Sequence, residues 1–235
     1  MYLTKIFSFV LFNLKLQNLM KNQLLIILFL INILSVKSQE NDVGNWLIYF
    51  GNKELNSRLN WHHEIQHRNY NLIGELEQLL IRTGLGYDIN ENNNALMGYG
   101  FIDSRNKVIE TNELLKVKEH RIYQQFISKQ AIGKIKIQHR YRFEQRFIEN
   151  NFKLRYRYFL SINAPLFKRN EKYYISAYNE IFINSNEEKT FDRNRIYGGL
   201  GYKLNSNIKI EMGYMNQIFN NSSRDQLNVI CFFNF

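Results

Sequence analysis

The sequence predicts an all-β fold, an antiparallel up-and-down transmembrane β-barrel of about 10–12 strands preceded by an N-terminal signal peptide. Three observations support this prediction. The segment 134–147 alternates between charged or amide positions and largely apolar positions. Similar alternating segments follow one another along the chain. The last of them ends in an aromatic residue at the C-terminus.

The segment 134–147 has two chemically different faces. Successive side chains of a strand point to opposite sides, so even and odd positions form separate faces. A face this cationic is rare in a soluble sandwich, whereas a membrane barrel with lipid outside and a polar lumen inside requires such contrast. The odd positions are mostly aliphatic or aromatic, and the even positions are Lys134, Lys136, Gln138, Arg140, Arg142, Glu144 and Arg146.

The N-terminal region has the organisation of a secretory signal peptide. Lys21 precedes the apolar run 24–31, which is too short to span a membrane. The tripeptide 36–38 then places small residues at the positions that a signal peptidase reads, so we expect cleavage before Gln39.

The natural start of this leader is Met20, which makes residues 1–19 an upstream extension. The alternative is a membrane anchor over residues 6–34, but lysine and amide side chains interrupt that stretch. The sequence therefore divides into an extension and signal peptide, residues 1–38, and an outer-membrane barrel, residues 39–235.

The chain is basic, with a net charge of +10, and removal of the leader takes away four lysines and no acid, which leaves +6. A basic chain can bind nucleic acid when its charges form a patch or stripe. Here the bases alternate with apolar residues along strands, and the chain is predicted to be exported. We therefore expect outer-membrane lipid as its surroundings and no nucleic acid as a partner.

Strand-like alternation occurs in eleven segments of the predicted barrel domain. These segments are 46–50, 59–65, 79–89, 95–101, 119–126, 134–147, 152–163, 173–183, 193–204, 208–218 and 224–235. Bacterial single-chain barrels have an even number of strands, so we expect ten or twelve. Either one strand has been missed or one segment does not span.

Turn lengths orient the predicted barrel. Counting back from Phe235, the short turns 205–207 and 90–94 fall on the periplasmic side and the longer loop 103–116 falls outside. The segment containing Trp46 then runs in the wrong direction for an even-stranded barrel.

The last segment carries a C-terminal signal. Leu227, Val229, Cys231 and Phe233 occupy every second position before the terminal Phe235. An amphipathic strand that ends in an aromatic residue resembles the assembly signal of outer-membrane barrels, so Phe233 and Phe235 are predicted to engage the barrel-assembly machinery. Cys231 is the only cysteine, so no intramolecular disulfide can form, and we expect it to serve as a small apolar side chain.

Glycines on the polar positions of several strands are predicted to leave lumen space for long arginine and tyrosine side chains and to let the sheet bend. The run 198–201 could suggest a phosphate-binding loop, but no Lys-Ser/Thr pair follows it and its context is a strand.

Several motifs follow one another in a characteristic order. They are Arg82-x-Gly84-Leu85-Gly86-Tyr87, Gly98-Tyr99, Glu119-His120-Arg121, the stretch from His139 to Phe147, Arg155-Tyr156-Arg157, the stretch from Asn179 to Phe182, Arg193-Asn194-Arg195 and Gly213-Tyr214. Over nearly all of residues 43–235 the chain resembles the exported barrel proteins catalogued as domain of unknown function 2490. That resemblance implies an outer-membrane β-barrel and implies no activity.

The inward positions of the predicted strands form a charged lumen network. A tight turn near residues 149–151 opposes Glu144 to Arg155 in the predicted hairpin, and a shifted register would oppose it to Arg157 or Lys153. The predicted network comprises Arg82, Glu119, Arg121, Arg140, Arg142, Glu144, Arg146, Arg155, Arg157, Glu180, Arg193, Arg195 and Glu211.

Two functions fit such a lumen. Ion pairs could fill a narrow barrel and lock it as a closed scaffold, which we favour, or the excess of arginine could line a narrow anion-favouring pore. A hydrolase or a surface-binding protein is a further alternative. The histidines are His62, His63, His67, His120 and His139. The first three lack a metal-ligand spacing on one strand face, and no Ser/His/Asp set is singled out. We therefore predict no catalytic, cofactor or metal site and a monomeric protein in the outer membrane of a Gram-negative bacterium.

Overall fold

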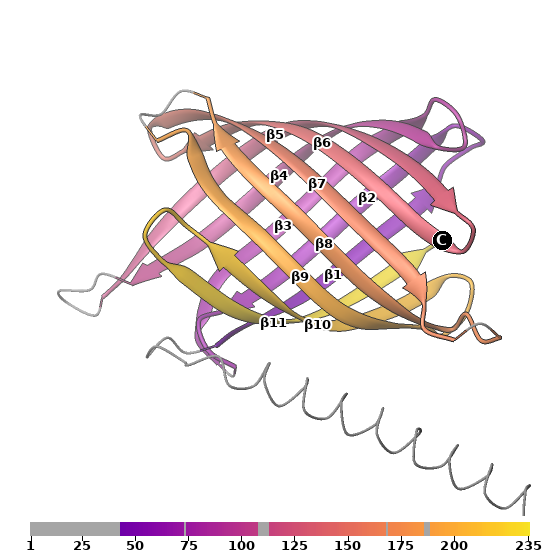
Figure 1. The fold of residues 1–235 in the computed structure, drawn as a ribbon. Helices are drawn as coiled ribbons and strands as arrows, with labels where there is room; N and C mark the ends of the chain where they lie inside the picture. The colour runs from indigo at the N-terminus through magenta and orange to yellow at the C-terminus, as the bar shows by residue number, and fades with distance from the viewer. Residues whose placement is uncertain (1–42, 73, 108–112, 168, 186–188) are drawn as a thin grey trace, which may run out of the picture. The chain divides into compact units, whose positions relative to one another are not determined.

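The computed structural model describes residues 43–235 except 73, 108–112, 168 and 186–188, and these residues form a closed β-barrel of eleven strands (Figure 1). No helix among them is long and apolar enough to cross a membrane. The predicted signal peptide and its cleavage site before Gln39 lie outside the described residues. The strands are β1 (Gly44–Glu54), β2 (Leu59–Asn69), β3 (Leu76–Asp88), β4 (Asn93–Lys107), β5 (Leu114–Ile132), β6 (Ile135–Ile148), β7 (Asn151–Pro165), β8 (Tyr173–Asn184), β9 (Phe191–Lys203), β10 (Ile208–Ile218) and β11 (Ser223–Asn234).

All eleven predicted segments are strands, and the expectation of ten or twelve strands is wrong. Each strand pairs antiparallel with the next along the chain, and the barrel closes through a parallel pair of β1 and β11. The register of this pair runs from Gly44 opposite Gln226 to Asn52 opposite Asn234. An odd number of strands that alternate in direction must bring two strands of equal direction together at closure. The segment at Trp46 runs in the same direction as β11, which an even-stranded barrel would not allow. It is nevertheless a wall strand, because it pairs with β11 in parallel.

The C-terminus is fixed at one end of the barrel by backbone hydrogen bonds. The backbone amide of Phe235 donates to the carbonyl of Asn52 (2.9 Å), and the backbone amide of Asn234 donates to the carbonyl of Asn207 (2.9 Å). Because β1 runs parallel to β11, Gly44 lies at the opposite end. The predicted loop 103–116 is mostly strand, since β4 continues to Lys107 and β5 begins at Leu114.

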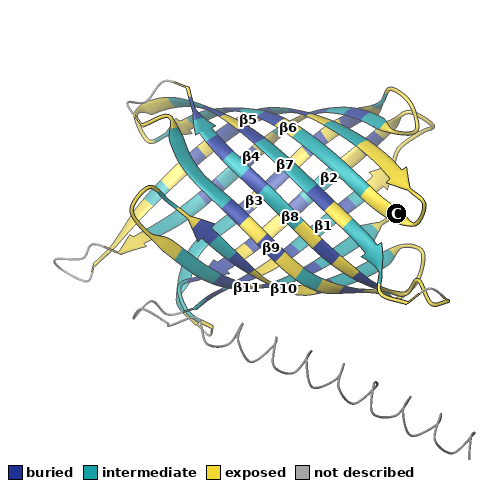
Figure 2. Cartoon of the chain, viewed as in Figure 1, coloured by how far each residue is buried: buried dark blue, intermediate teal, exposed yellow. Residues whose placement is uncertain are grey.

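Side chains alternate between the interior and the outer surface along the strands, as the burial colours in Figure 2 show. Large apolar side chains are exposed on the outside, for example Met212 and Met97, with 65% and 61% of their surface exposed. The inward positions of the same strands carry buried arginine, glutamate and amide side chains. Polar groups thus form much of the barrel core, and apolar groups form its outer surface.

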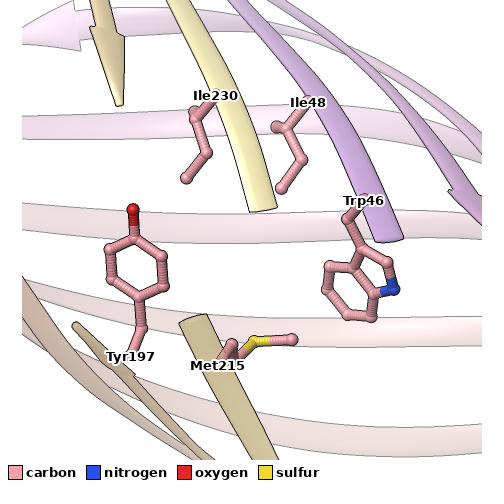
Figure 3. Packing of buried hydrophobic residues seen from close by; sticks show 5 residues of the cluster. All are labelled: Trp46, Ile48, Tyr197, Met215 and Ile230. Atoms are coloured by element: carbon pink, nitrogen blue, oxygen red, sulfur yellow. The ribbon is translucent and has the colours of Figure 1, made fainter. Parts of the chain in front are cut away.

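In β1, by contrast, apolar side chains face inward as well as outward, where Leu47 is exposed. Trp46 and Ile48 pack with Tyr197, Met215 and Ile230 into the apolar cluster of the interior, which is built from β1, β9, β10 and β11 (Figure 3). Because β1 and β11 are parallel and in register, Ile48 lies opposite Ile230, and both side chains point to the same side.

Glycines opposite interior tyrosines confirm that these positions provide space. A Cβ at Gly201 would lie 2.1 Å from the Tyr174 ring, and one at Gly213 would lie 2.5 Å from the Tyr197 hydroxyl. Both rings therefore lie flat across the wall, where any other residue would displace them.

Candidate functional site

Glu144 lies at the centre of the interior charge network and has no exposed surface. Arg155 from β7 donates to its Oε2 through both Nε (2.9 Å) and Nη2 (2.7 Å). Arg157 donates to Oε1 at 2.7 Å, Arg121 from β5 lies 3.4 Å away, and Arg142 lies 3.8 Å away. Four guanidinium groups thus surround one carboxylate. A buried carboxylate needs such partners, because an unpaired charge in the interior is costly.

Glu180 on β8 forms a second centre that shares an arginine with the first. Its Oε1 accepts from Arg157 Nη2 (2.6 Å) and from Arg140 Nη2 (2.8 Å), while its Oε2 lies 3.7 Å from Arg195. Arg157 therefore bridges Glu144 and Glu180. This links β6, β7, β8 and β9 through side chains as well as through the backbone.

Glu119 on β5 forms a third centre. Arg146 binds it bidentately, with Nε 2.8 Å from Oε1 and Nη2 3.0 Å from Oε2. The Nε of Arg121 donates to the same carboxylate at 2.8 Å. Because Arg121 also approaches Glu144, the three centres form one continuous network.

The structure adds three charged residues that the predicted network lacks. Glu64 accepts from Arg82 Nη1 (2.9 Å), and Arg68 is buried four residues further along β2. Both lie on the inward parity of their segment, so the alternation that identified the other members could have found them. Asp192 pairs with Arg155 (2.9 Å), and the alternation of its segment does not identify it as an inward residue. A register shift next to Phe182 turns Asp192 inward, and alternation does not reveal a bulge.

Two predicted members stand at the edge of the network. Glu211 is buried and accepts a hydrogen bond from the Tyr174 hydroxyl (2.9 Å), whereas Glu119, Glu144 and Glu180 bind arginines. Arg193 is partly exposed and pairs with Asp192 (3.2 Å). The remaining predicted members are joined through Glu64, Glu119, Glu144 and Glu180.

Aromatic rings separate several of the arginines. The Phe182 ring centroid lies 4.4 Å from the guanidinium carbon of Arg157 and 4.6 Å from that of Arg195. The Trp46 ring centroid lies 3.8 Å from the guanidinium carbon of Arg68 and 4.8 Å from the guanidinium carbon of Arg195. Guanidinium groups stack favourably on ring faces, and the attraction increases where water is excluded. The rings thus help to hold like charges close together.

A cavity of about 810 Å³ occupies one part of the interior. Its lining includes Ser57, Asn90 and Asn234, so it reaches the end of the barrel where Phe235 lies. Its deep end is formed by arginine and glutamate side chains, including Arg142 and Glu180.

The network beyond this deep end is packed. Glu119, Arg121, Glu144, Arg146 and Arg155 do not line the cavity. Side chains that have less than 2% of their surface exposed and do not line the cavity come from β3, β4, β5, β6, β8, β10 and β11, namely Leu80, Ile102, Tyr123, Glu144, Phe182, Met215, Gln226 and Asn228. The arrangement is therefore a recess that opens at one end and is filled toward the other.

The predicted histidines are divided between the two sides of the wall. His62 lines the cavity, and its Nε2 lies 3.7 Å from Glu64. His63 lies outside and contacts Trp61 with the two rings tilted (4.7 Å between ring centroids), and His139 stacks on Tyr158 (6.1 Å). Within the described parts of residues 43–235, no group of three or more His, Cys, Asp or Glu side chains could hold a metal ion.

The predicted assembly residues lie on the outer surface. Phe235 has 61% of its surface exposed, and its ring centroid lies 6.3 Å from that of Phe233. Tyr49 and His63 contact these two rings, at 5.4 Å from Phe233 and 6.1 Å from Phe235. The terminal residues therefore belong to an external aromatic cluster that spans the parallel β1–β11 closure.

Comparison with known proteins agrees with the resemblance seen in the motifs. An uncharacterized protein from Methylorubrum extorquens is 27% identical over 164 residues, which cover 66% of this chain and 69% of that protein. A solved porin structure aligns with a TM-score of 0.37 and 14% identity, over 76% of this chain and 59% of the porin. The family described as "Protein of unknown function (DUF2490)" matches residues 43–228. The chain therefore belongs to the DUF2490 family.

Proposed function

We propose that this protein is an integral outer-membrane β-barrel that acts as a closed scaffold, because its interior ion-pair network prevents steady ion flow. The proposal has two parts, placement in a membrane and a sealed interior. Different observations support the two parts.

Membrane placement is supported by the outer surface. Large apolar side chains from nearly every strand are exposed there, including Leu85, Met97, Leu200 and Met212, each with at least 60% of its surface exposed. Soluble monomers rarely expose apolar patches larger than a few hundred Å². In a bilayer the same surface contacts acyl chains, and a closed barrel leaves no unpaired strand edge in lipid.

One observation supports the proposal of a sealed interior, namely the complete burial of Glu144 among four arginines. A carboxylate beside a continuous water-filled path would retain exposed surface. The fully buried side chains from most other strands extend this packed region across the interior.

The competing function is a narrow anion-favouring pore, since arginine outnumbers glutamate in the network. Its arginines are largely engaged with carboxylates, amides or rings at close range, which favours the closed scaffold. Opening a path would require several of these contacts to break together.

Planar-bilayer recording of the purified protein tests the proposal. We expect no steady conductance above that of the bare membrane under applied voltage. Protein that shifts in gel mobility on heating serves as the control for a folded barrel. Steady, anion-selective steps would refute the closed scaffold and support the pore.

A further inference from the structure

We propose that the cavity at the Phe235 end binds an organic anion with an apolar body. The acidic group of this ligand would lie against the arginine-rich deep end, and its body would lie along the aromatic side formed by β1 and β11. This inference concerns the open recess and does not rest on the sealed interior.

The deep end of the cavity has an excess of positive charge. The buried carboxylates of the described lining are Glu64, Glu180 and Glu211, and they are outnumbered by six arginines and Lys209. The arginines are Arg68, Arg82, Arg140, Arg142, Arg157 and Arg195. A recess with low-dielectric walls concentrates such a field and attracts anions.

Two of these arginines are positioned by neutral amides. Gln125 Oε1 accepts from Nε (2.9 Å) and Nη2 of Arg142. The Nη1 of Arg142 is buried and has no hydrogen-bond partner among the described residues, and its nearest carboxylate is Glu144 at 3.8 Å. Arg68 donates to Gln78 (2.6 Å) and to Gln66 (2.9 Å). An amide fixes a guanidinium group without neutralising it, so Arg68 keeps its charge for an anion. Arg142 is only partly neutralised, because it shares Glu144 with three arginines that lie closer to that carboxylate.

The side of the cavity formed by β1 and β11 is apolar. Trp46, Ile48, Phe50, Ile230 and Phe232 line it. The Phe50 and Phe232 rings are stacked with centroids 5.3 Å apart. These residues are adjacent because the parallel closing pair places Ile48 opposite Ile230 and Phe50 opposite Phe232. The parallel closure therefore gives an apolar side to a recess whose deep end is charged.

Size and chemistry define the ligand class. Cavities that bind small molecules usually enclose about 300–1,000 Å³ and combine apolar walls with a few fixed polar groups. The volume of about 810 Å³ lies within that range. Planar guanidinium groups bind carboxylate, sulfonate or phosphate groups through paired hydrogen bonds. The fitting ligand is therefore a molecule with one such group and an aromatic or aliphatic body.

The chain contains a natural reporter for this site. It has two tryptophans, of which Trp61 is exposed on the outside and Trp46 lines the cavity next to Arg68. In a Trp61→Phe variant in lipid nanodiscs, the fluorescence of Trp46 reports the cavity alone. We would titrate this variant with 4-bromobenzoate, whose bromine quenches on contact, and with the neutral analogue 4-bromobenzyl alcohol.

We expect saturable quenching by the benzoate with a Kd at least about tenfold lower than for the alcohol, which corresponds to about 1.4 kcal/mol. Equal Kd values for the two probes would overturn the anion site. Quenching that rises linearly with both probes would overturn the binding site as a whole. This comparison needs no substitution in the charged network.

A matched pair of variants locates the charge. Arg142→Gln should weaken benzoate binding by about tenfold and leave binding of the alcohol unchanged. Arg146→Gln removes another interior arginine, which pairs with Glu119 and does not line the cavity, so this variant should bind both probes as the parent protein does. Unchanged benzoate binding by a folded Arg142→Gln protein would contradict the placement of the anion at Arg142. If that variant does not fold, the comparison of the benzoate with the alcohol still tests the anion site.

The outcome is independent of the bilayer recording. Steady conductance with selective benzoate binding would refute the closed scaffold and support the ligand site. No steady conductance together with no saturable binding would support the closed scaffold and refute the ligand site.

Discussion

Arg155 faces Glu144 directly across the β6–β7 hairpin and binds one carboxylate oxygen, Oε2, through both Nε and Nη2. The other oxygen, Oε1, accepts from Arg157, which also binds Glu180. A single hairpin therefore supplies the central carboxylate and two of its main cations. The predicted register of this hairpin is confirmed.

Glu144→Gln should strongly destabilise the barrel. The change removes the charge that compensates four buried guanidinium groups, and breaking a buried pair from one side costs about 3–5 kcal/mol. Chemical unfolding in detergent, followed by tryptophan fluorescence, measures the loss.

Glu171→Gln is the control for this substitution. Glu171 is exposed, and a hydrogen bond from Lys134 (2.6 Å) lowers the pKa of its carboxyl group. Surface pairs contribute little, so its unfolding midpoint should not change measurably. Equal midpoints for wild type and Glu144→Gln would contradict the central role of Glu144.

The double variant Arg142→Ser/Arg157→Ser should open small conductances and lower thermal stability together. The same side chains fill space and hold the network together. Removing members of a coupled polar network costs more stability than the sum of the single contacts. Planar-bilayer recording and the temperature of the gel-mobility shift measure the two effects. Arg58→Ser, at an exposed position, should change neither the conductance nor the stability. If the double variant behaves like wild type, the sealing role assigned to these arginines is wrong.

Gly201→Ala should destabilise the barrel by about 1–3 kcal/mol, the usual cost of overpacking. Its Cβ would lie 2.1 Å from the Tyr174 ring and would displace the hydroxyl that donates to Glu211. Gly198→Ala is a matched control on the same strand, because nothing lies within 4 Å of its Cβ position. Comparison of their unfolding midpoints checks the prediction, and similar values would show that Tyr174 can move freely.

Deletion of Phe235 should reduce insertion into the outer membrane. The residue extends an external aromatic cluster at the β1–β11 closure, and its amide donates to Asn52. Quantifying the heat-shifted band in outer-membrane fractions measures assembly. Normal amounts of the truncated protein would argue against a C-terminal assembly signal.

The mature protein should begin at or near Gln39 if the N-terminal region is a signal peptide. Intact mass of membrane-extracted protein measures the start directly. Retention of residues 20–38 would refute cleavage and favour an N-terminal anchor.

The sequence by itself determined the strands and their two faces. Alternation is a local property, so the pattern from Lys134 to Arg146 was enough to place each side chain on one side of the wall. The tight turn after Ile148 favoured the register that opposes Glu144 to Arg155, because a short connection limits the register, but Arg157 and Lys153 stayed open as partners until the structure was known.

Only the tertiary structure decided how the barrel closes and what its interior contains. Pairing of β1 with β11 joins residues almost two hundred positions apart, and no local pattern reports it. The inward turn of Asp192 depends on a bulge opposite β8, and the apolar side at Trp46 depends on the parallel closure. Division of the interior into a packed part and a recess depends on which side chains meet across the barrel. Strand direction and side-chain parity are set by neighbouring residues, whereas closure and packing are set by contacts between distant ones.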